Sequence, residues 1–171
     1  MSIATKRPPD REVKPTRDSP PVYEADFYAW TQQQAALFKE NRLSELDVEH
    51  LIEEIESLGR SEKRELESRL KVLLMHLLKW QFQAEKLDQH GRSWLATIRN
   101  QRTELRKLLR DNPSLQSHME SAFSEAYQDA RYEAEAETGL KIMTFPENCP
   151  YGLEQVLDAV WLPAKEKANE H

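Results

Sequence analysis

The 171-residue sequence has little cysteine, little glycine and no long apolar run. Its single cysteine, Cys149, excludes an intramolecular disulfide and gives no sign of an oxidising compartment. No apolar segment lies before Pro21, so we expect no secretory signal peptide. The longest apolar stretch, 72–78, contains His76 and is far too short to span a bilayer. These absences predict a cytoplasmic protein that does not enter a membrane.

The residues that are abundant favour helices. Ala, Leu, Glu, Gln, Lys and Arg dominate, whereas only four glycines occur, and these abundant types lose little side-chain freedom in a helix. The net charge of −6, with both signs mixed along the chain, argues against a dedicated nucleic-acid binder. Five of the nine prolines fall in residues 1–21, which we expect to be a disordered tail. Residues 22–163 are then one helical domain, and 164–171 form a polar C-terminal tail.

Apolar periodicity predicts an all-α bundle of about five main helices and a short C-terminal helix. Asp26 is the expected N-cap of the first helix, and either Ser44 or Asp47 caps the second. Gly59 and Gly139 are placed as C-terminal stops of the second and fifth helices. The expected helices cover residues 26–42, 44–59 (or from 47), 61–82, 93–112, 114–139 and 151–159.

Three of these helices have informative apolar patterns. The helix over 61–82 has a four-three seam and further apolar residues around its second half, so it should form the buried centre. The seam consists of Leu66, Leu70, Leu73, Leu77 and Trp80. The helix over 44–59 carries one apolar face, made of Val48, Leu51, Ile52, Ile55 and Leu58. Alanines on the helix over 114–139 should let a neighbouring helix approach closely.

Several short phrases occur together in this chain in a specific order and spacing. They are Asp26-x-x-x-Trp30, LIEEIESLG (51–59), HLLKW (76–80), Ser93-Trp94 with Ile98 and Arg102, Asn112-Pro113-Ser114-Leu115, Glu137-Thr138-Gly139-Leu140 and FPENCPYG (145–152). In these phrases the chain resembles the bacterial domain-of-unknown-function family number twenty-nine, over residues 22–163. The resemblance implies a helical bundle in a bacterial cytoplasmic protein. It implies no catalytic or binding residue, because the family has no assigned activity.

Arg102 is the residue least expected for a plain core. On the helical wheel it lies within the apolar arc of its helix, and a buried guanidinium needs a partner. We predict a structural ion pair with Glu54 or Asp47, which lie at the apolar edge of the second helix. Two alternatives are an anion-binding site and an arginine whose head group reaches solvent.

A possible metal site is suggested by Asp47, His50 and Glu54, which share one flank of the second helix. If the second and third helices pack antiparallel, His76 could approach this flank. However, a di-iron bundle requires two Glu-x-x-His motifs, and only one altered copy is present. We therefore favour a hydrogen-bonded structural network over a metal site, with an accidental surface cluster as the remaining alternative, and we expect no cofactor.

Other chemical candidates are isolated. His76 beside Trp80 is weakly suggestive of a catalytic base, but no serine or cysteine nucleophile stands at a recognisable spacing, so a packed edge histidine is preferred. Cys149 is either a reactive thiol near a helix start or a small buried group. Glu137 points inward on its helix. It either neutralises a basic residue or marks the end of the core.

A basic stripe formed by Arg99, Arg106 and Arg110, bordered by Arg102, runs along the helix over 93–112. Such a stripe can contact phosphates, but no aromatic residues are interleaved on the same face. The acidic faces of neighbouring helices could neutralise it, so nucleic-acid binding is a lesser alternative.

Together these patterns favour a protein-interaction or regulatory module without catalytic activity, with a protein as its partner and homo-oligomerisation left open. The sequence has no glycine-rich phosphate loop, no complete metal-ligand set and no nucleophile paired with a base. The alternatives are a small metal-binding protein or enzyme that uses Asp47, His50, Glu54 and His76, and a nucleic-acid-associated protein that uses the basic stripe. An exposed tryptophan would mark an interface.

Overall fold

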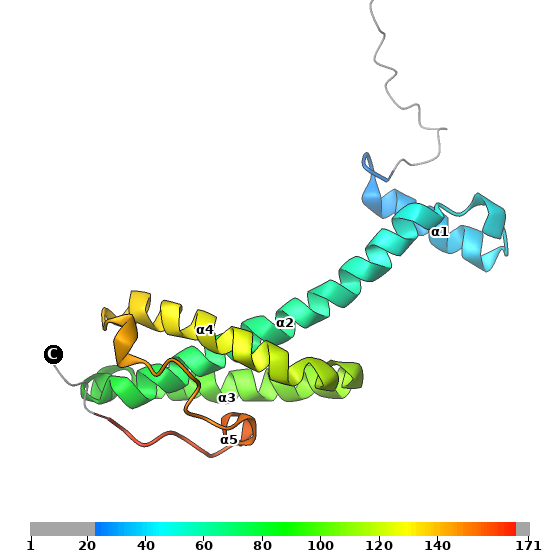
Figure 1. The fold of residues 1–171 in the computed structure, drawn as a ribbon. Coiled ribbons are helices and arrows are strands. Elements are labelled where there is room, and N and C mark those ends of the chain that lie inside the picture. Colours follow the sequence, from blue (N-terminus) through cyan, green and yellow to red (C-terminus); the bar gives the residue numbers. More distant parts are fainter. Residues whose placement is uncertain (1–22, 167–171) are drawn as a thin grey trace, which may run out of the picture. The chain divides into compact units, whose positions relative to one another are not determined.

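The computed structural model describes residues 23–166. The predicted N-terminal tail (1–21) and the end of the predicted polar tail (167–171) lie outside this range. All regular secondary structure in the described part is helical, with five α-helices, short 3-10 turns and no strand (Figure 1), so the predicted all-α class is confirmed. The α-helices are α1 (Phe27–Lys39), α2 (Val48–Phe82), α3 (Leu87–Asp111), α4 (Met119–Thr138) and α5 (Leu153–Leu157). The 3-10 turns are η1 (Leu43–Glu45), η2 (Ala84–Lys86), η3 (Pro113–His118) and η4 (Ile142–Thr144).

The chain divides into two compact units, with the division between Ile55 and Glu56. The first unit contains α1, η1 and the first turns of α2. The second unit contains the rest of α2 and everything that follows it. Each unit is described below by itself.

The predicted stop at Gly59 is wrong, because α2 continues without interruption from Val48 to Phe82. Two expected helices are therefore one. Gly59 is exposed and nothing lies within 4 Å of the position where its Cβ would be, so no packing forces the chain to turn. A glycine inside a helix costs about 1 kcal/mol. Ion pairs between residues four apart, from Glu56 to Arg60 and from Lys63 to Glu67, offset part of this cost.

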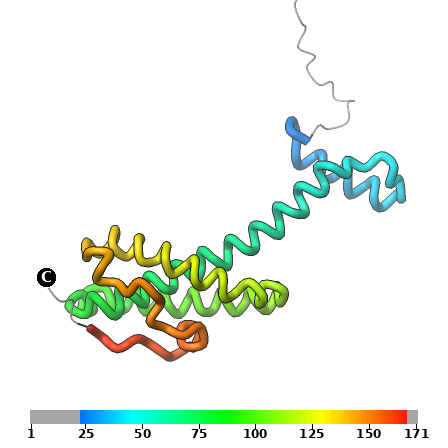
Figure 2. The backbone as a smooth tube through the Cα atoms, in the orientation of Figure 1, coloured from blue at the N-terminus to red at the C-terminus, as the bar shows by residue number. Residues whose placement is uncertain are grey.

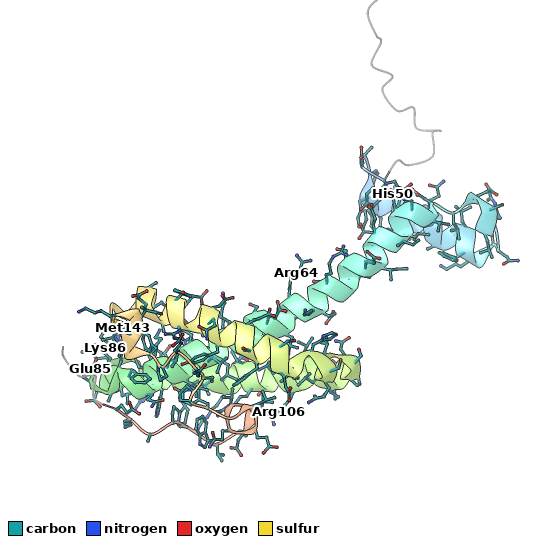
Figure 3. All side chains as sticks on the ribbon, in the orientation of Figure 1. His50, Arg64, Glu85, Lys86, Arg106 and Met143 are labelled. Atoms are coloured by element: carbon teal, nitrogen blue, oxygen red, sulfur yellow. The ribbon has the colours of Figure 1, made fainter. Side chains whose placement is uncertain are left out.

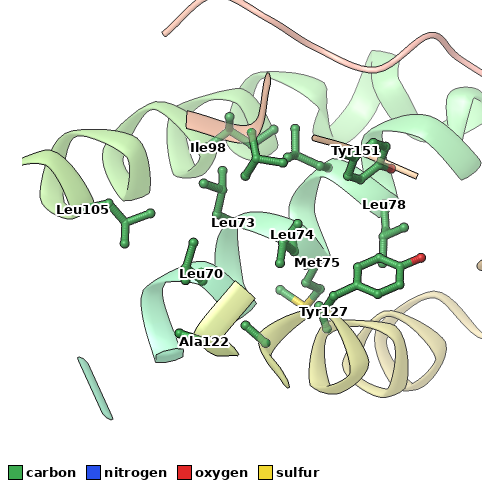
Figure 4. Close-up of a cluster of buried hydrophobic side chains, with 14 of the residues drawn as sticks. Leu70, Leu73, Leu74, Met75, Leu78, Ile98, Leu105, Ala122, Tyr127 and Tyr151 are labelled. Atoms are coloured by element: carbon green, nitrogen blue, oxygen red, sulfur yellow. The ribbon is translucent and has the colours of Figure 1, made fainter. Parts of the chain in front are cut away.

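The core of the second unit lies between α2, α3 and α4. Figure 4 shows Leu70, Leu73 and Leu74 of α2 between Ile98 and Leu105 of α3 on one side and Ala122 and Tyr127 of α4 on the other. The predicted central role of residues 61–82 is therefore confirmed. Its seam leucines are fully buried, and they are Leu66, Leu70, Leu73 and Leu77.

The alanine face of α4 packs into this core as expected. Four alanines spaced four residues apart are at most 2% exposed, and they are Ala122, Ala126, Ala130 and Ala134. A side chain of one methyl group lets α4 lie close to the leucines of α2. The helix then ends where predicted, because Gly139 has the left-handed φ of 73° that favours glycine.

The observed starts of the helices agree less well with those predicted from the sequence. The N-cap of α1 is confirmed, since the side chain of Asp26 accepts a hydrogen bond from the amide of Ala29 at 2.9 Å. However, α3 begins at Leu87 rather than Ser93. Gly91 is buried inside this helix, beside Leu87 and Trp80. The closing helix is shorter than expected.

Residues 145–166 run alongside the bundle as a mostly extended segment that carries α5 (Figure 2). Hydrogen bonds attach this segment at several points. The Tyr151 hydroxyl donates to Gln81 Oε1 at 2.5 Å, and the main-chain amide of Glu166 donates to the carbonyl of Gln81 at 2.8 Å. The segment therefore covers the α2–α3 side of the core as an integral part of the second unit.

Candidate functional site

The first unit is a helical hairpin with a very small core. On α1 only Trp30, Gln34 and Leu37 are buried, at 3–5% exposure. Gln34 and Trp30 both form hydrogen bonds with Asp47, the residue before α2. Polar contacts as well as apolar ones therefore hold α1 against the start of α2.

Asp47 is the centre of these polar contacts. As the residue before α2 it accepts a 3.4 Å hydrogen bond from the amide of His50, so it caps the helix as predicted. Its Oδ2 also accepts from Trp30 Nε1 at 3.1 Å and lies 2.7 Å from His50 Nδ1, while its own amide donates to Gln34 Oε1 at 2.9 Å. Partial burial favours the neutral acid, but the hydrogen bonds from His50 and Trp30 outweigh it and lower the pKa of Asp47. Conversely, the hydrogen bond to Asp47 raises the pKa of His50.

Tyr23, which lies before α1, closes this cluster. Its ring stacks on His50 with centroids 4.2 Å apart and meets Trp30 edge-on at 4.9 Å. Its hydroxyl donates to Glu54, and this bond raises the pKa of the phenol to about 12. No pattern in the sequence singled out Tyr23. Its spacing of four residues from Phe27 and seven from Trp30 is the one feature that could have indicated it.

The structure brings together three of the four predicted metal-site residues, Asp47, His50 and Glu54, but in a network of hydrogen bonds (Figure 3 labels His50). The fourth, His76, lies 26 positions further along the same helix, so the antiparallel pair required for its approach does not form. Across residues 23–166, no group of three or more His, Cys, Asp and Glu has an arrangement that could hold a metal ion. Two surface hollows of about 450 and 310 Å³ are lined by none of these four residues.

The remaining feature of the first unit is an exposed apolar surface on α2. Val48, Ile52 and Ile55 of α2 are 55%, 52% and 67% exposed. We call these three side chains the open face. The helical pattern had grouped them correctly on one face, but that face meets solvent instead of a core. Leu58, in the second unit, is also 67% exposed.

An acidic edge borders the open face. Glu49 and Glu53 are exposed, and within the described range neither has a hydrogen-bond or ion-pair partner. Residues 23–55 hold eight acidic residues and two basic ones, and one of the two, Arg42, is paired with Glu40 and Glu45. The surface around the open face is therefore strongly negative.

His76 and Trp80 belong to the second unit and have structural partners. The Nδ1–H of His76 donates to the carbonyl of Val72 at 2.8 Å, and burial lowers the pKa of its imidazole. Trp80 is half-buried and lies 5.8 Å from the ammonium group of Lys165. These contacts fit the packed edge histidine, and they give His76 no nucleophile to activate.

The sequence predicts an ion pair of Arg102 with Glu54 or Asp47. Within the second unit Arg102 is buried at 2% exposure, and its partners there are main-chain carbonyls. Its Nε and one Nη donate at 2.8 Å to the main-chain carbonyls of Val156 and Trp161. Burial lowers the pKa of the guanidinium, while the charge of Asp158 opposes that shift. The spacing of the sequence could not reveal these partners, because any residue can supply a carbonyl.

The basic stripe of α3 is exposed, and Arg106 is labelled in Figure 3. Arg110 is paired with Asp111, whereas Arg99 and Arg106 have no carboxylate partner among the described residues. Arg92, seven residues before Arg99, extends the stripe and was missed from the sequence.

The two other isolated candidates also have structural explanations. Glu137 pairs with the largely buried Lys79, with their charged groups 2.5 Å apart, so it neutralises a basic residue. Burial raises the pKa of the Cys149 thiol to about 11, so the group is not a thiolate at neutral pH.

These observations describe an all-α protein with a helical hairpin whose apolar face is exposed. The family model described as Domain of unknown function DUF29 matches residues 22–162, and the chain belongs to this family. No curated protein and no solved structure matches the chain. Among the described residues, no helix has both the length and the apolar character needed to cross a lipid bilayer.

Proposed function

We propose that this chain is a bacterial cytoplasmic protein-interaction module that acts through the open face and has no catalytic chemistry of its own. The observation that carries the proposal is the imbalance in the first unit. Three large apolar residues of α2 are more than half exposed beside a core of only Trp30, Gln34 and Leu37 on α1. Such contiguous apolar surface is a feature of sites that bind other proteins.

The experiment is site-specific photocrosslinking in cells of the source organism. The photoreactive residue p-benzoylphenylalanine replaces Ile52, and in a control it replaces Glu40, which is exposed in the same unit. The expected result is a covalent adduct with one defined protein from position 52, lost when Ile55→Gln is added. Circular dichroism checks that the second substitution leaves the helix content unchanged.

The proposal fails if position 52 yields no adduct, or if both positions yield the same adducts. Because Ile52 and Ile55 project into solvent, their replacement should change the free energy of unfolding by less than about 0.5 kcal/mol. Loss of the adduct therefore reports on binding and not on folding.

Nucleic-acid association is a second candidate, supported by the exposed arginines of α3. Arg92, Arg99 and Arg106 repeat every seven residues and have no carboxylate partner in the described part of the chain. If they bind phosphates, retention on a DNA column should fall steeply with salt and should weaken in an Arg92→Ala/Arg99→Ala variant. Absence of retention at low salt would remove this candidate.

A further inference from the structure

We propose that the open face binds an amphipathic helix of another protein, and that the polar edge of this partner helix is basic. The inference rests on the proposed function and specifies the partner's chemistry. It is carried by the apolar spacing on α2 and by the charge beside it.

The apolar residues have the spacing of a helix–helix seam. Val48, Ile52 and Ile55 are separated by four and three residues, which is the repeat by which one helix packs its side chains into another. β-Branched side chains have few rotamers, so little freedom is lost when they become buried. A helix is therefore the partner element that fits this surface.

The negative charge beside the seam determines which charge the partner helix should carry. Glu49 lies three residues before Ile52, which makes the two neighbours on the helix surface. With Ile52 at a seam position, Glu49 occupies a flanking position of the kind that pairs with a facing charge across two helices. Glu49 and Glu53 form no ion pair within the described residues, so lysine or arginine on a docked helix would supply their counter-charge.

Two other occupants fit less well. A second copy of this chain would set Glu49 and Glu53 against another strongly acidic unit, because residues 23–55 hold eight acidic and two basic residues. The chain's own residues 1–22 carry five basic residues, but five prolines interrupt them and only Ile3, Val13 and Val22 are apolar and β-branched. That composition cannot supply an apolar helical face.

The test measures fluorescence anisotropy of two labelled peptides with the full-length chain. Each probe is about 20 residues long with leucines at seam spacing, and the flanking positions are lysine in one probe and glutamate in the other. We expect the lysine probe to bind at least about tenfold more tightly at low salt, with the difference shrinking toward about 0.5 M NaCl. Glu49→Lys/Glu53→Lys should reverse the preference. The matched control Glu24→Lys/Glu40→Lys makes the same charge change outside α2 and should preserve it.

A third variant separates docking from simple charge attraction. Ile52→Gln/Ile55→Gln should abolish binding of both probes while the acidic edge is intact. If the lysine probe still binds this variant with unchanged affinity, attraction is only electrostatic and the inference is overturned.

The remaining outcomes distinguish the inference from the proposed function. Equal binding of both probes, or of neither while crosslinking from position 52 succeeds, overturns the basic partner helix and leaves the interaction module standing. A dimer in sedimentation equilibrium that the Ile52→Gln/Ile55→Gln variant dissociates would identify a second copy as the occupant. A crosslink from position 52 to residues 1–22 of the same chain would identify that segment. Either result overturns the inference.

Discussion

At the scale of single residues, Arg102 shows how the core accommodates a cation. Two N–H groups of the guanidinium are directed at carbonyls of the C-terminal segment, at Val156 and Trp161. Hydrogen bonds from a charged donor are stronger than neutral ones. Arg102 therefore fastens residues 145–166 to α3, and its role in this structure is to hold that segment in place.

Replacing Arg102 with methionine should destabilise the chain by about 2–4 kcal/mol, since it leaves two inward-facing carbonyls without their donors. Urea unfolding followed by circular dichroism measures this change. Arg99→Met, on the exposed side of the same helix, is the control and should shift the free energy of unfolding by less than about 0.5 kcal/mol. Equal effects of the two variants would contradict the anchoring role.

The Asp47–His50 pair predicts a pH dependence. The pKa of His50 is raised in the folded chain, so its stabilising contribution is complete below about pH 6.5 and is lost as the pH rises through the folded pKa. The pKa of Asp47 is lowered, so its contribution is present above about pH 4 and is lost as the pH falls through the folded pKa. The contact between α1 and α2 should therefore be firmest between about pH 4 and 6.5.

Asp47→Asn tests this coupling, because it removes the charge that holds the proton on His50. The expected result is a lower pKa for His50, measured from the pH dependence of its imidazole proton resonances in NMR. Glu24→Gln, an exposed carboxylate of the same unit, should leave that titration nearly unchanged. If Asp47→Asn also leaves it unchanged, the hydrogen bond does not control His50.

At the scale of helices, α2 shows how a local stop signal can be overridden. Gly59 lies in a continuous helix, whereas Gly139 ends α4 in a left-handed conformation. The same residue type therefore has opposite roles in the two places, and the difference lies in φ and not in composition.

Alanine substitutions should separate these two roles. Gly59→Ala should stabilise the chain by about 0.5–1 kcal/mol, because a methyl group meets open space there and alanine favours helix. Gly139→Ala should destabilise it by about 1 kcal/mol, because its φ of 73° is unfavourable for a residue with a Cβ. Thermal unfolding of both variants measures the two shifts. A destabilising Gly59→Ala would indicate that the helix does end at that glycine.

At the scale of the whole molecule, the two units have very different amounts of core. The second unit holds a continuous apolar cluster drawn from α2, α3, α4 and the C-terminal segment. The first buries only three residues of α1. Stability within one chain is lowest where few apolar contacts are buried.

Amide hydrogen exchange should therefore separate the units. We expect the amides of Trp30–Phe38 to be protected at least about tenfold less than those of Leu70–Leu78. Mass spectrometry of peptic fragments measures both segments in one experiment. Equal protection would show that the first unit unfolds only together with the second, and addition of the lysine probe should raise protection in the first unit specifically.

Four features could be predicted from the sequence alone, and they are the helical class, the central place of residues 61–82, the cap at Asp26 and the end at Gly139. Each of these depends on local propensity or on the period of one helix. The other features depend on contacts, or on the absence of contacts, between residues far apart in the chain. The helix continues through Gly59 because no packing partner makes the chain turn there. Arg102 donates hydrogen bonds to carbonyls that lie far along the chain. The apolar face of α2 was visible as a pattern, but only the fold left it uncovered, because burial depends on what lies opposite a helix and not on the helix itself.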